Sequence, residues 1–232
     1  MTGKPLTGRL ALVTGGSKGI GAAIAAGLRL DGATVVRAAR SLPEDAPAGE
    51  VHLAVDLESD AGLGALIDRL GRIGVPDLVV SAAGGFSLGG IEDVGVEVLD
   101  RLYQINLRAP YELARRLLPP MKARGRGRHI LIGSIADHLA LPGNAAYAAT
   151  KFGARGLHEV LQAEFRGSGV LCSLVSPGPV DTPLWDPIDP DRRPDLPSRA
   201  AMLRPDDVAA AVRWIATRPP HVDVPWLQLG PA

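Results

Sequence analysis

The chain has 232 residues, of which 46% are hydrophobic and 22% are charged, so it has enough apolar material for a buried core and is not a disordered polypeptide. Its 25 lysines and arginines balance its 25 aspartates and glutamates, so no net charge favours nucleic acid or an anionic membrane as a partner. The only cysteine in the sequence, Cys172, cannot form an internal disulfide or a multi-cysteine metal site, and its apolar neighbours favour a buried strand thiol.

Short apolar runs alternate with longer amphipathic segments, which predicts strands and helices in turn. Strands are expected at 9–14, 33–39, 51–56, 77–83, 128–134, 169–176 and 222–230, and helices at 19–31, 60–73, 97–123, 146–167 and 204–218. Such continuous apolar runs indicate strands buried on both faces, and the helical crossovers indicate a parallel sheet. We predict a doubly wound α/β fold, with helices on both faces of about seven parallel strands, in one domain spanning 1–232.

Proline and glycine mark two longer connections, at 42–50 and at about 177–203. The second follows the carboxyl end of a strand, where open α/β sheets bind ligands, so we interpret it as a substrate lid. The helix after it is expected to be capped near Asp206. No apolar stretch reaches the roughly 18 residues that span a bilayer, and the N-terminus reaches glycines before any signal-peptide core, so we expect a cytoplasmic protein.

The first expected strand runs into the glycine-rich turn Gly15-Gly16-Ser17-Lys18-Gly19-Ile20-Gly21, which opens the first expected helix. In this context Gly15 suits a tight turn, Gly19 the close approach of backbone to a pyrophosphate, and Gly21 the packing of helix against strand. The helix N-terminus adds N–H donors and the positive end of the helix dipole. The pattern predicts a dinucleotide site; a plain strand-to-helix turn is the alternative.

The spacing TGxxxGxG resembles that of the short-chain dehydrogenase/reductase family, and the resemblance covers nearly the whole chain. Further family motifs follow in order: Ser81-Ala82-Ala83-Gly84, Asn106, Ser134, Tyr147-Ala148-Ala149-Thr150-Lys151 and Pro177-Gly178. The sequence departs from the family at Ser81 and Ser176, where Asn is common. The resemblance implies a Rossmann-type fold and hydride transfer with a nicotinamide cofactor.

The form of the cofactor can be argued from charge at the end of the second strand, where an acid would bind the ribose 2′-hydroxyl and repel a 2′-phosphate. Here Arg40 and Ser41 stand instead, and the guanidinium fork of Arg40 suits a phosphate. The resemblance adds that a base at Lys18 is typical of NADP-preferring members. We therefore predict NADP(H), with two solvated surface cations as the alternative.

Tyr147 and Lys151 are four residues apart on an expected helix, so their side chains project from one face. A nearby ammonium and an oxidised nicotinamide would lower the pKa of the phenol toward working pH. Ser134 ends an apolar strand, where its hydroxyl could hold the substrate oxygen. By resemblance, Lys151 also bonds the nicotinamide ribose, and Asn106 anchors a water that relays protons to Lys151.

Positions near these motifs complete the predicted site. By resemblance Asp56 contacts the adenine amino group, with the backbone of Leu57 beside it. The predicted cofactor-binding residues are Gly15, Ser17, Lys18, Gly19, Ile20, Gly21, Arg40, Ser41, Asp56, Leu57, Ser81, Ala82, Ala83, Gly84, Tyr147, Lys151, Pro177, Gly178, Val180 and Thr182. The predicted substrate-binding residues are Ser134, Phe86, His138, Asn144, Leu184 and Trp185, with Leu139 as a further candidate. The histidines lack metal-ligand spacing, so no metal is expected.

These features predict an oxidoreductase that moves a hydride between NADP(H) and a carbonyl or alcohol carbon of a small molecule. The resemblance favours a 3-oxoacyl type ketone reductase, while steroid, sugar and xenobiotic carbonyls stay open. One alternative is a non-catalytic NADP(H)-binding sensor or scaffold; another is an epimerase or dehydratase, which usually has a larger substrate domain. The resemblance also implies a homodimer or homotetramer formed by the helices at 97–123 and 146–167, with Leu157 and Leu161 as candidate contacts.

Overall fold

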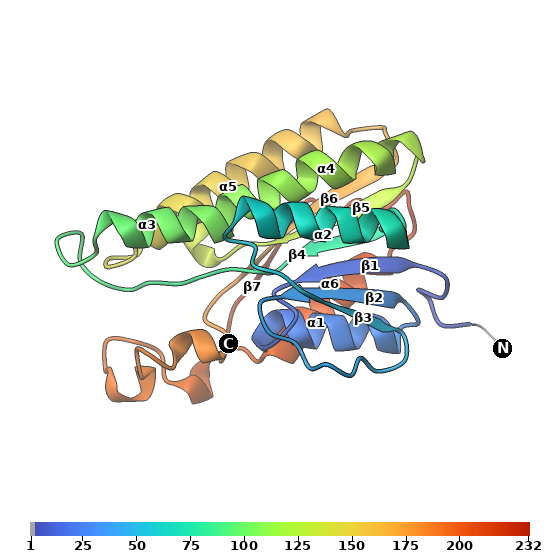
Figure 1. The fold of residues 1–232 in the computed structure, drawn as a ribbon. Helices are drawn as coiled ribbons and strands as arrows, with labels where there is room; N and C mark the ends of the chain where they lie inside the picture. The colour runs from blue at the N-terminus through green and yellow to red at the C-terminus, as the bar shows by residue number, and fades with distance from the viewer. Residues whose placement is uncertain (1–2) are drawn as a thin grey trace.

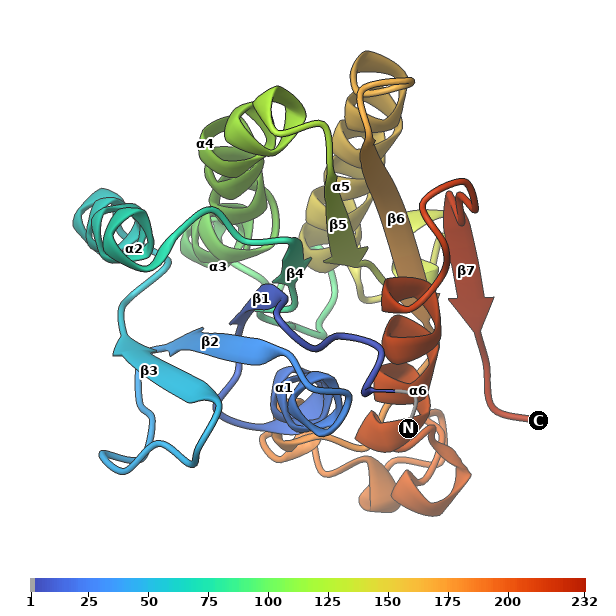
Figure 2. The same ribbon diagram turned by 90° about the vertical axis from the view of Figure 1, so that its right-hand side faces the viewer.

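The computed structural model describes residues 3–232 and is built on one parallel sheet in the order β3-β2-β1-β4-β5-β6-β7 (Figures 1 and 2). The strands are β1 (Leu10–Thr14), β2 (Thr34–Ala39), β3 (Glu50–Ala54), β4 (Leu78–Ser81), β5 (Gly127–Ile132), β6 (Val170–Pro177) and β7 (Trp226–Leu229). The chain builds outward from β1 to β3, then returns to the other side of β1 through β4. The predicted doubly wound sheet is confirmed, with strand ends shifted by a few residues.

Helices cover both faces of this sheet (Figure 2). One face carries α1 (Gly19–Leu30) and α6 (Pro205–Ala216), and the other carries α2 (Asp60–Ile73), α4 (Ala109–Ala123) and α5 (Ala145–Glu164). Because successive strand residues point to opposite faces, Leu12 enters the core under α2 and α4 while Val13 enters the core under α1. Short 3₁₀ helices lie at Ile135–Asp137, Pro183–Trp185, Pro190–Arg192 and Arg199–Ala201. No helix among residues 3–232 is long and apolar enough to cross a membrane.

The helix predicted at 97–123 is divided by a π-helical turn. It consists of α3 (Val96–Tyr103), the π turn Gln104–Arg108 and α4. Pro110 explains the break, because it has no N–H to donate to the carbonyl of Asn106 as a regular α-helix would require. The N–H of Ala109 accordingly donates to the carbonyl of Gln104, five residues back. The bulge thus places Asn106 where the backbone ladder is locally interrupted.

The pairing of α1 with α6 depends on a glycine and an ion pair. A Cβ at Gly27 would lie 2.5 Å from Cδ of Arg213, so a larger residue there would displace that side chain. Arg213 then donates to both carboxylate oxygens of Asp31, at 2.8 and 2.6 Å. At the start of α6, which was predicted to be capped near Asp206, the capping acid is the adjacent Asp207, which accepts from the N–H of Arg204 at 2.7 Å. The reason is position, since an N3 side chain can reach back to the N-cap.

The predicted lid leaves β6 and returns to α6 through residues 178–204, projecting beyond the sheet (Figure 1). Its base is closed by a parallel bridge between Val180 and Leu203. Arg199 donates to Asp181 at 2.6 Å and to Asp186 at 2.8 Å, and so ties the two arms of the loop together. The segment is therefore held by its own bridge and ion pairs.

A buried histidine in β5 is expected to make the fold sensitive to acid. His129 has no exposed surface, and burial, with His158 nearby, lowers its pKa to about 4, from the ordinary value of about 6.5. The folded state therefore binds fewer protons than the unfolded chain between these pH values, so stability falls as the pH drops through this window. The full difference is roughly 3 kcal/mol.

We expect the free energy of unfolding in urea to decrease between pH 6.5 and 5, above the range in which carboxylates titrate. His129→Gln removes the titrating group and should flatten this part of the curve. A smaller slope of stability against pH should remain in the variant, because burial also lowers the pKa of His158. An identical slope in His129→Gln and the unmodified protein would assign the acid sensitivity to other groups.

Candidate active site

A long cleft lies at the carboxyl edge of the sheet, beside the point where the strand order reverses between β1 and β4. It consists of two adjoining cavities of about 700 and 170 Å³. Residues from three segments line both cavities: Ile20, Ala82, Gly84, Thr182 and Leu184. This is the edge at which open α/β sheets bind ligands.

The glycine-rich turn forms one wall of the larger cavity, and its glycines are required by geometry. Gly15 and Gly19 have φ angles of 68° and 55°, in the left-handed region that favours glycine. A Cβ at Gly21 would lie 2.2 Å from the carbonyl oxygen of Gly15. Helix α1 starts at Gly19 with no side-chain cap on its first N–H groups. Backbone donors and a wall without side chains fit the pyrophosphate of a dinucleotide.

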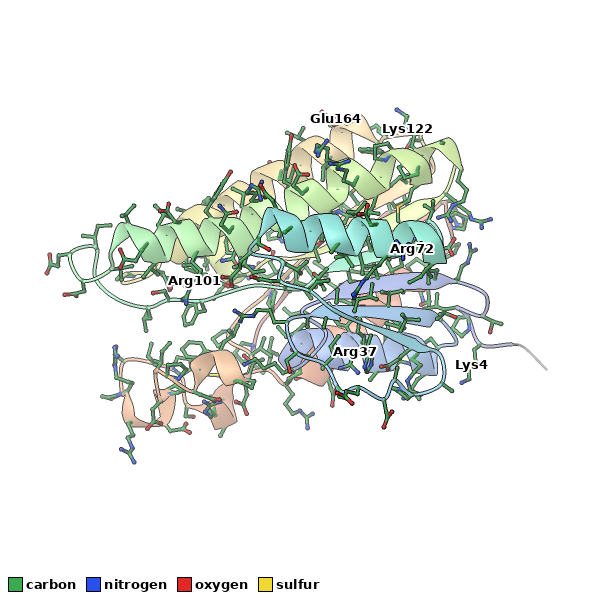
Figure 3. All side chains as sticks on the ribbon, viewed as in Figure 1. Lys4, Arg37, Arg72, Arg101, Lys122 and Glu164 are labelled. Carbon is green, nitrogen blue, oxygen red and sulfur yellow. The ribbon has the colours of Figure 1, made fainter. Side chains whose placement is uncertain are left out.

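Arg37, which lies in β2 and is labelled in Figure 3, was not predicted as part of the site. Its side chain supports the glycine-rich turn. Its Nε donates to the carbonyl oxygen of Gly16 at 2.8 Å, and its Nη1 pairs with Glu50 at 3.0 Å. The side chain of Glu50 is 2% exposed, and Arg37, Arg29 and His52 together hold the pKa of its carboxyl below the ordinary value against the effect of burial. A lone arginine inside the apolar run of β2 is the signal that could have found it.

The outer end of the larger cavity carries charges of both signs. Lys18 and Arg40 lie on its wall as predicted, together with Asp56 and with Glu58, which was not predicted. Arg40 lies 3.6 Å from Glu58 and its side chain is 74% exposed, so this ion pair is weak. One oxygen of Asp56 accepts from the N–H of Glu58 at 3.1 Å, which fixes the carboxylate at the cavity rim.

The smaller cavity brings together Ser134, Tyr147 and Lys151 from two elements. Ser134 follows β5, and Tyr147 and Lys151 lie one turn apart in α5. Nζ of Lys151 donates to the carbonyl of Ile132 at 3.1 Å, which holds the ammonium beside the end of β5. The ammonium also lies 5.6 Å from the centre of the Tyr147 ring. The predicted convergence of these three side chains is present.

The protein's own groups set the pKa of both α5 side chains. Burial raises the pKa of Tyr147 to about 12, a hydrogen bond with Ser134 opposes the rise, and the charge of Asp137 adds to it. Burial lowers the pKa of Lys151 to about 8, and Asp137 opposes the fall. The protein's own groups thus set the pKa of the phenol above its ordinary value, because desolvation dominates. The predicted lowering includes the charge of an oxidised nicotinamide and stays a prediction. Additional positive charge beside the phenol is needed to bring it toward neutrality.

Asn106 lies behind the cavity wall and is 2% exposed. Its Oδ1 accepts from the N–H of Gly85 at 2.9 Å, and its Nδ2 donates to the carbonyl of Gly85 and to Oγ1 of Thr150. Protein groups therefore occupy the side-chain amide. Pro110 has no N–H and so cannot donate to the backbone carbonyl of Asn106, as the residue at that position of an α-helix would.

Aromatic and aliphatic side chains form the outer wall of the smaller cavity. The ring of Phe86 meets the ring of Tyr147 edge to face and tilts against Trp185, with 5.0 Å between centroids in both pairs. Leu184 from the loop and Asn144, the residue before α5, also lie on this wall as predicted. Leu141, which was not predicted, lies on this wall.

Two predicted site residues point elsewhere. Ser81, assigned to the cofactor, is buried at the end of β4 with its hydroxyl 3.3 Å from Nε2 of His129, so it supports the sheet. His138, assigned to the substrate, lies outside both cavities with Nδ1 2.6 Å from Asp137 and its ring against Trp226. Leu139 is also outside, and 44% exposed. The 3₁₀ turn after Ser134 directs the side chains of His138 and Leu139 away from the cavities, and the periodicity of the sequence does not reveal this.

Within residues 3–232, no three His, Cys, Asp or Glu side chains are arranged to hold a metal ion.

The remaining predicted residues lie on the cavity walls. On the larger cavity these are Gly15, Ser17, Lys18, Gly19, Ile20, Gly21, Arg40, Ser41, Asp56, Leu57, Ala82, Ala83, Gly84 and Thr182. On the smaller cavity they are Pro177, Gly178 and Val180, with the side chains described above. Sequence reasoning missed apolar wall residues such as Leu42, Pro43, Val55 and Pro183, because contact with the cleft depends on how the loops fold back.

The sheet and its cleft define a Rossmann-type α/β protein with a dinucleotide-shaped site. The sequence profile of the short chain dehydrogenase family matches residues 9–193, and the chain belongs to this family of oxidoreductases. The cyclic-di-GMP-binding biofilm dispersal mediator protein of Escherichia coli (strain K12) is 35% identical over 220 residues, which is 90% of each chain.

Two solved structures share the fold over nearly their full length. A 3-oxoacyl (acyl-carrier-protein) reductase from Agrobacterium tumefaciens C58 with NADP bound has a TM-score of 0.83 at 29% identity, covering 97% of this chain and 94% of that one. A metagenomic short-chain oxidoreductase in complex with NADP has a TM-score of 0.82 at 32% identity, covering 98% and 99% of the two chains.

Proposed function

We propose that this protein is an NADP(H)-dependent oxidoreductase acting on a carbonyl or alcohol carbon of a small molecule, and that residues 1–232 work as one domain. The observation that carries the proposal is the convergence of Ser134, Tyr147 and Lys151 in a small cavity that adjoins a cleft floored by the glycine-rich turn. Both structural relatives described above contain NADP, which supports the same cofactor here.

The residues divide the chemistry between them. The nicotinamide, when bound, supplies or accepts the hydride at the reacting carbon. Ser134 donates a hydrogen bond to the substrate oxygen, and Tyr147 passes its proton to that oxygen during reduction and takes one back during oxidation. Lys151 holds the cofactor ribose and keeps a positive charge beside the phenol. Asn106 fixes Gly85 and Thr150 and offers its backbone carbonyl to a relay water.

Lys18 and Arg40 are the proposed determinants of NADP(H) over NAD(H), because each can make a charge-assisted bond to the 2′-phosphate. We expect Arg40→Asp to weaken NADPH binding by about tenfold or more and to strengthen NADH binding, reversing the preference. Fluorescence titration with both cofactors measures the two dissociation constants. Arg192→Asp, at a side chain that is 87% exposed and outside the cleft, is the matched charge control. Equal affinity of the unmodified protein for NADPH and NADH would contradict the assignment.

The walls of the smaller cavity support a substrate with a compact apolar group next to its carbonyl. Phe86, Leu141, Leu184 and Trp185 surround the position beside Tyr147, in a space of about 170 Å³. Among the candidates from sequence, a 3-oxoacyl type ketone is our first choice, and the Agrobacterium tumefaciens relative is a reductase of that class. The test is a screen of ketones, including acyl thioesters, steroids and sugars, for loss of NADPH absorbance.

The second candidate is a nucleotide-binding sensor or scaffold without turnover. It is favoured by the Escherichia coli relative, whose name describes binding of cyclic-di-GMP and a role in biofilm dispersal. The presence of Ser134, Tyr147 and Lys151 in one cavity favours the enzyme. NADPH binding without turnover of any screened ketone or alcohol would favour the sensor. An epimerase or dehydratase would be identified by product formation without net NADPH oxidation.

We also propose a cytoplasmic homodimer or homotetramer that pairs through α4 and α5. Large apolar side chains on these helices are exposed, namely Tyr111, Phe152 and Val160 at 49, 47 and 54%. Of the two contacts suggested from sequence, Leu161 is wrong because it is buried in the chain's own core. Leu157 packs against that core but is only partly buried, so its contact with a second subunit stays a prediction. Helical spacing alone did not distinguish the inner face of α5 from its outer face.

A further inference from the structure

A fully buried carboxylate lies three residues after Ser134 and has no part in the chemistry proposed above. Asp137 is 0% exposed and ends the 3₁₀ helix Ile135–Asp137. Its Oδ2 accepts from the N–H of Ser134 at 3.2 Å and from the hydroxyl of Ser176 at 2.6 Å. Nδ1 of His138 lies 2.6 Å from Oδ1. A buried charge is costly unless it is fully bonded, and this one is bonded on both oxygens.

The surrounding residues are shaped for this carboxylate. A Cβ at Gly133 would lie 2.4 Å from Oδ2 of Asp137 and 3.2 Å from Oγ of Ser176. The side chain of Ser176 is short enough to donate its hydroxyl directly to Asp137. Trp226 in turn donates from Nε1 to Oγ of Ser176 at 3.0 Å. The hydrogen bonds thus run from the edge strand β7 through β6 to the turn after β5.

The same turn determines where the hydroxyl of Ser134 lies. Oγ of Ser134 accepts from the N–H of Ala136 at 3.2 Å while the N–H of Ser134 donates to Asp137. These reciprocal bonds form a capping box, which holds the backbone and the side chain of Ser134 together. Movement of the carboxylate would therefore move the hydroxyl that faces the cavity.

We propose that Asp137 is a positioning residue of the active site, which fixes the turn that presents Ser134 and places a negative charge behind the Tyr147–Lys151 pair. The proposal rests on the function proposed above. Asp137 acts through Ser134 and through its electric field, without contact with the substrate.

The negative charge of Asp137 acts on Tyr147 and Lys151 in the same direction. Its charge raises the pKa of both Tyr147 and Lys151. The other polar and charged groups around it are His138 on its own segment, Arg155 on α5 with Nη1 3.8 Å from Oδ1, and Ser176 on β6. From β7, Trp226 contributes its ring, over which the guanidinium of Arg155 lies at 4.8 Å. Removing the negative charge therefore lowers the pH at which the Tyr147–Lys151 pair releases its first proton, whichever member carries it.

The test is the titration of the Tyr147 phenol in Asp137→Asn, which keeps the shape and removes the charge. Ultraviolet difference spectra of the NADP⁺ complex, taken against Tyr147→Phe in the same background, report this phenol separately from Tyr103 and Tyr111. We expect the midpoint to move to lower pH by about half a unit or more. Asp77→Asn is the matched control, because Asp77 also lies in an ion-pair cluster, with a side chain 13% exposed, at the opposite edge of the sheet. A midpoint that does not move in a folded Asp137→Asn protein overturns the proposal.

A second variant tests the positioning role, and it can be measured even if Asp137→Asn does not fold. Ser176→Ala removes one donor from Oδ2 and leaves the charge, so we expect about threefold or greater loss of kcat, with the NADPH dissociation constant and the phenol midpoint unchanged. Unchanged kcat in Ser176→Ala overturns positioning through this bond. Absence of turnover of every screened carbonyl contradicts the enzyme function instead, while the phenol titration still reports on Asp137.

Discussion

Tyr147→Phe is expected to lower kcat for carbonyl reduction by about 10² or more while leaving NADPH binding nearly unchanged. The substitution removes only the hydroxyl, which is the proposed proton donor. The ring stays, so its edge-to-face contact with Phe86 at 5.0 Å is kept. The measurements are steady-state NADPH oxidation with a substrate from the carbonyl screen and fluorescence titration of NADPH. Full turnover by a folded, NADPH-binding Tyr147→Phe protein would show that another group donates the proton.

Two further substitutions separate the proposed roles in the same assays. Lys151→Ala should weaken NADPH binding and lower kcat together, because one ammonium serves the ribose and the phenol. Ser134→Ala should lower kcat with little effect on NADPH binding. In the oxidation direction the rate of the unmodified enzyme should rise with pH as the phenol loses its proton. The protein's own groups raise the pKa of Tyr147 to about 12. The midpoint of the rate increase should lie at lower pH than this value, because the bound oxidised cofactor adds positive charge beside the phenol.

The features of this structure that depend on local sequence pattern could be predicted from the sequence. Apolar runs predicted all seven strands, and the glycine-rich turn and the Tyr147–Lys151 spacing identified two walls of the cleft. These features are readable because a strand, a tight turn and a helical i, i+4 pair each leave a local signature. The topology then brings the strand ends to one edge, so residues at those ends meet.

The errors share a different origin, since they concern the direction of side chains and their tertiary contacts. Nothing in the local pattern shows that the turn after Ser134 sends His138 toward β7, or that Ser81 faces His129. Arg37 reaches the glycine turn across two neighbouring strands, which is a tertiary contact. The π turn had a readable signal in Pro110, which lies within an otherwise helical pattern, but its consequence for Asn106 follows only from counting backbone donors.

Gly21→Ala is expected to weaken NADPH binding by about 100-fold or more and to lower the free energy of unfolding by roughly 1–3 kcal/mol, the usual cost of overpacking. The added Cβ would lie 2.2 Å from the carbonyl oxygen of Gly15 and 2.7 Å from its carbonyl carbon. These backbone atoms cannot withdraw easily, because the Cα of Gly15 faces Ala83, whose backbone would lie 2.8 Å from any Cβ added there. The turn must therefore shift, and with it the donors at the start of α1.

Gly71→Ala is the matched control for this prediction. Gly71 is exposed within α2, and a Cβ there meets nothing within 4 Å. This glycine-to-alanine substitution should stabilise the protein by about 0.5–1 kcal/mol through the helix propensity of alanine, with NADPH affinity unchanged. Urea unfolding and NADPH fluorescence titration of the two variants, side by side, measure both effects. Unmodified NADPH affinity in Gly21→Ala would place the pyrophosphate away from the glycine-rich turn, and the cofactor would then have to bind elsewhere along the cleft.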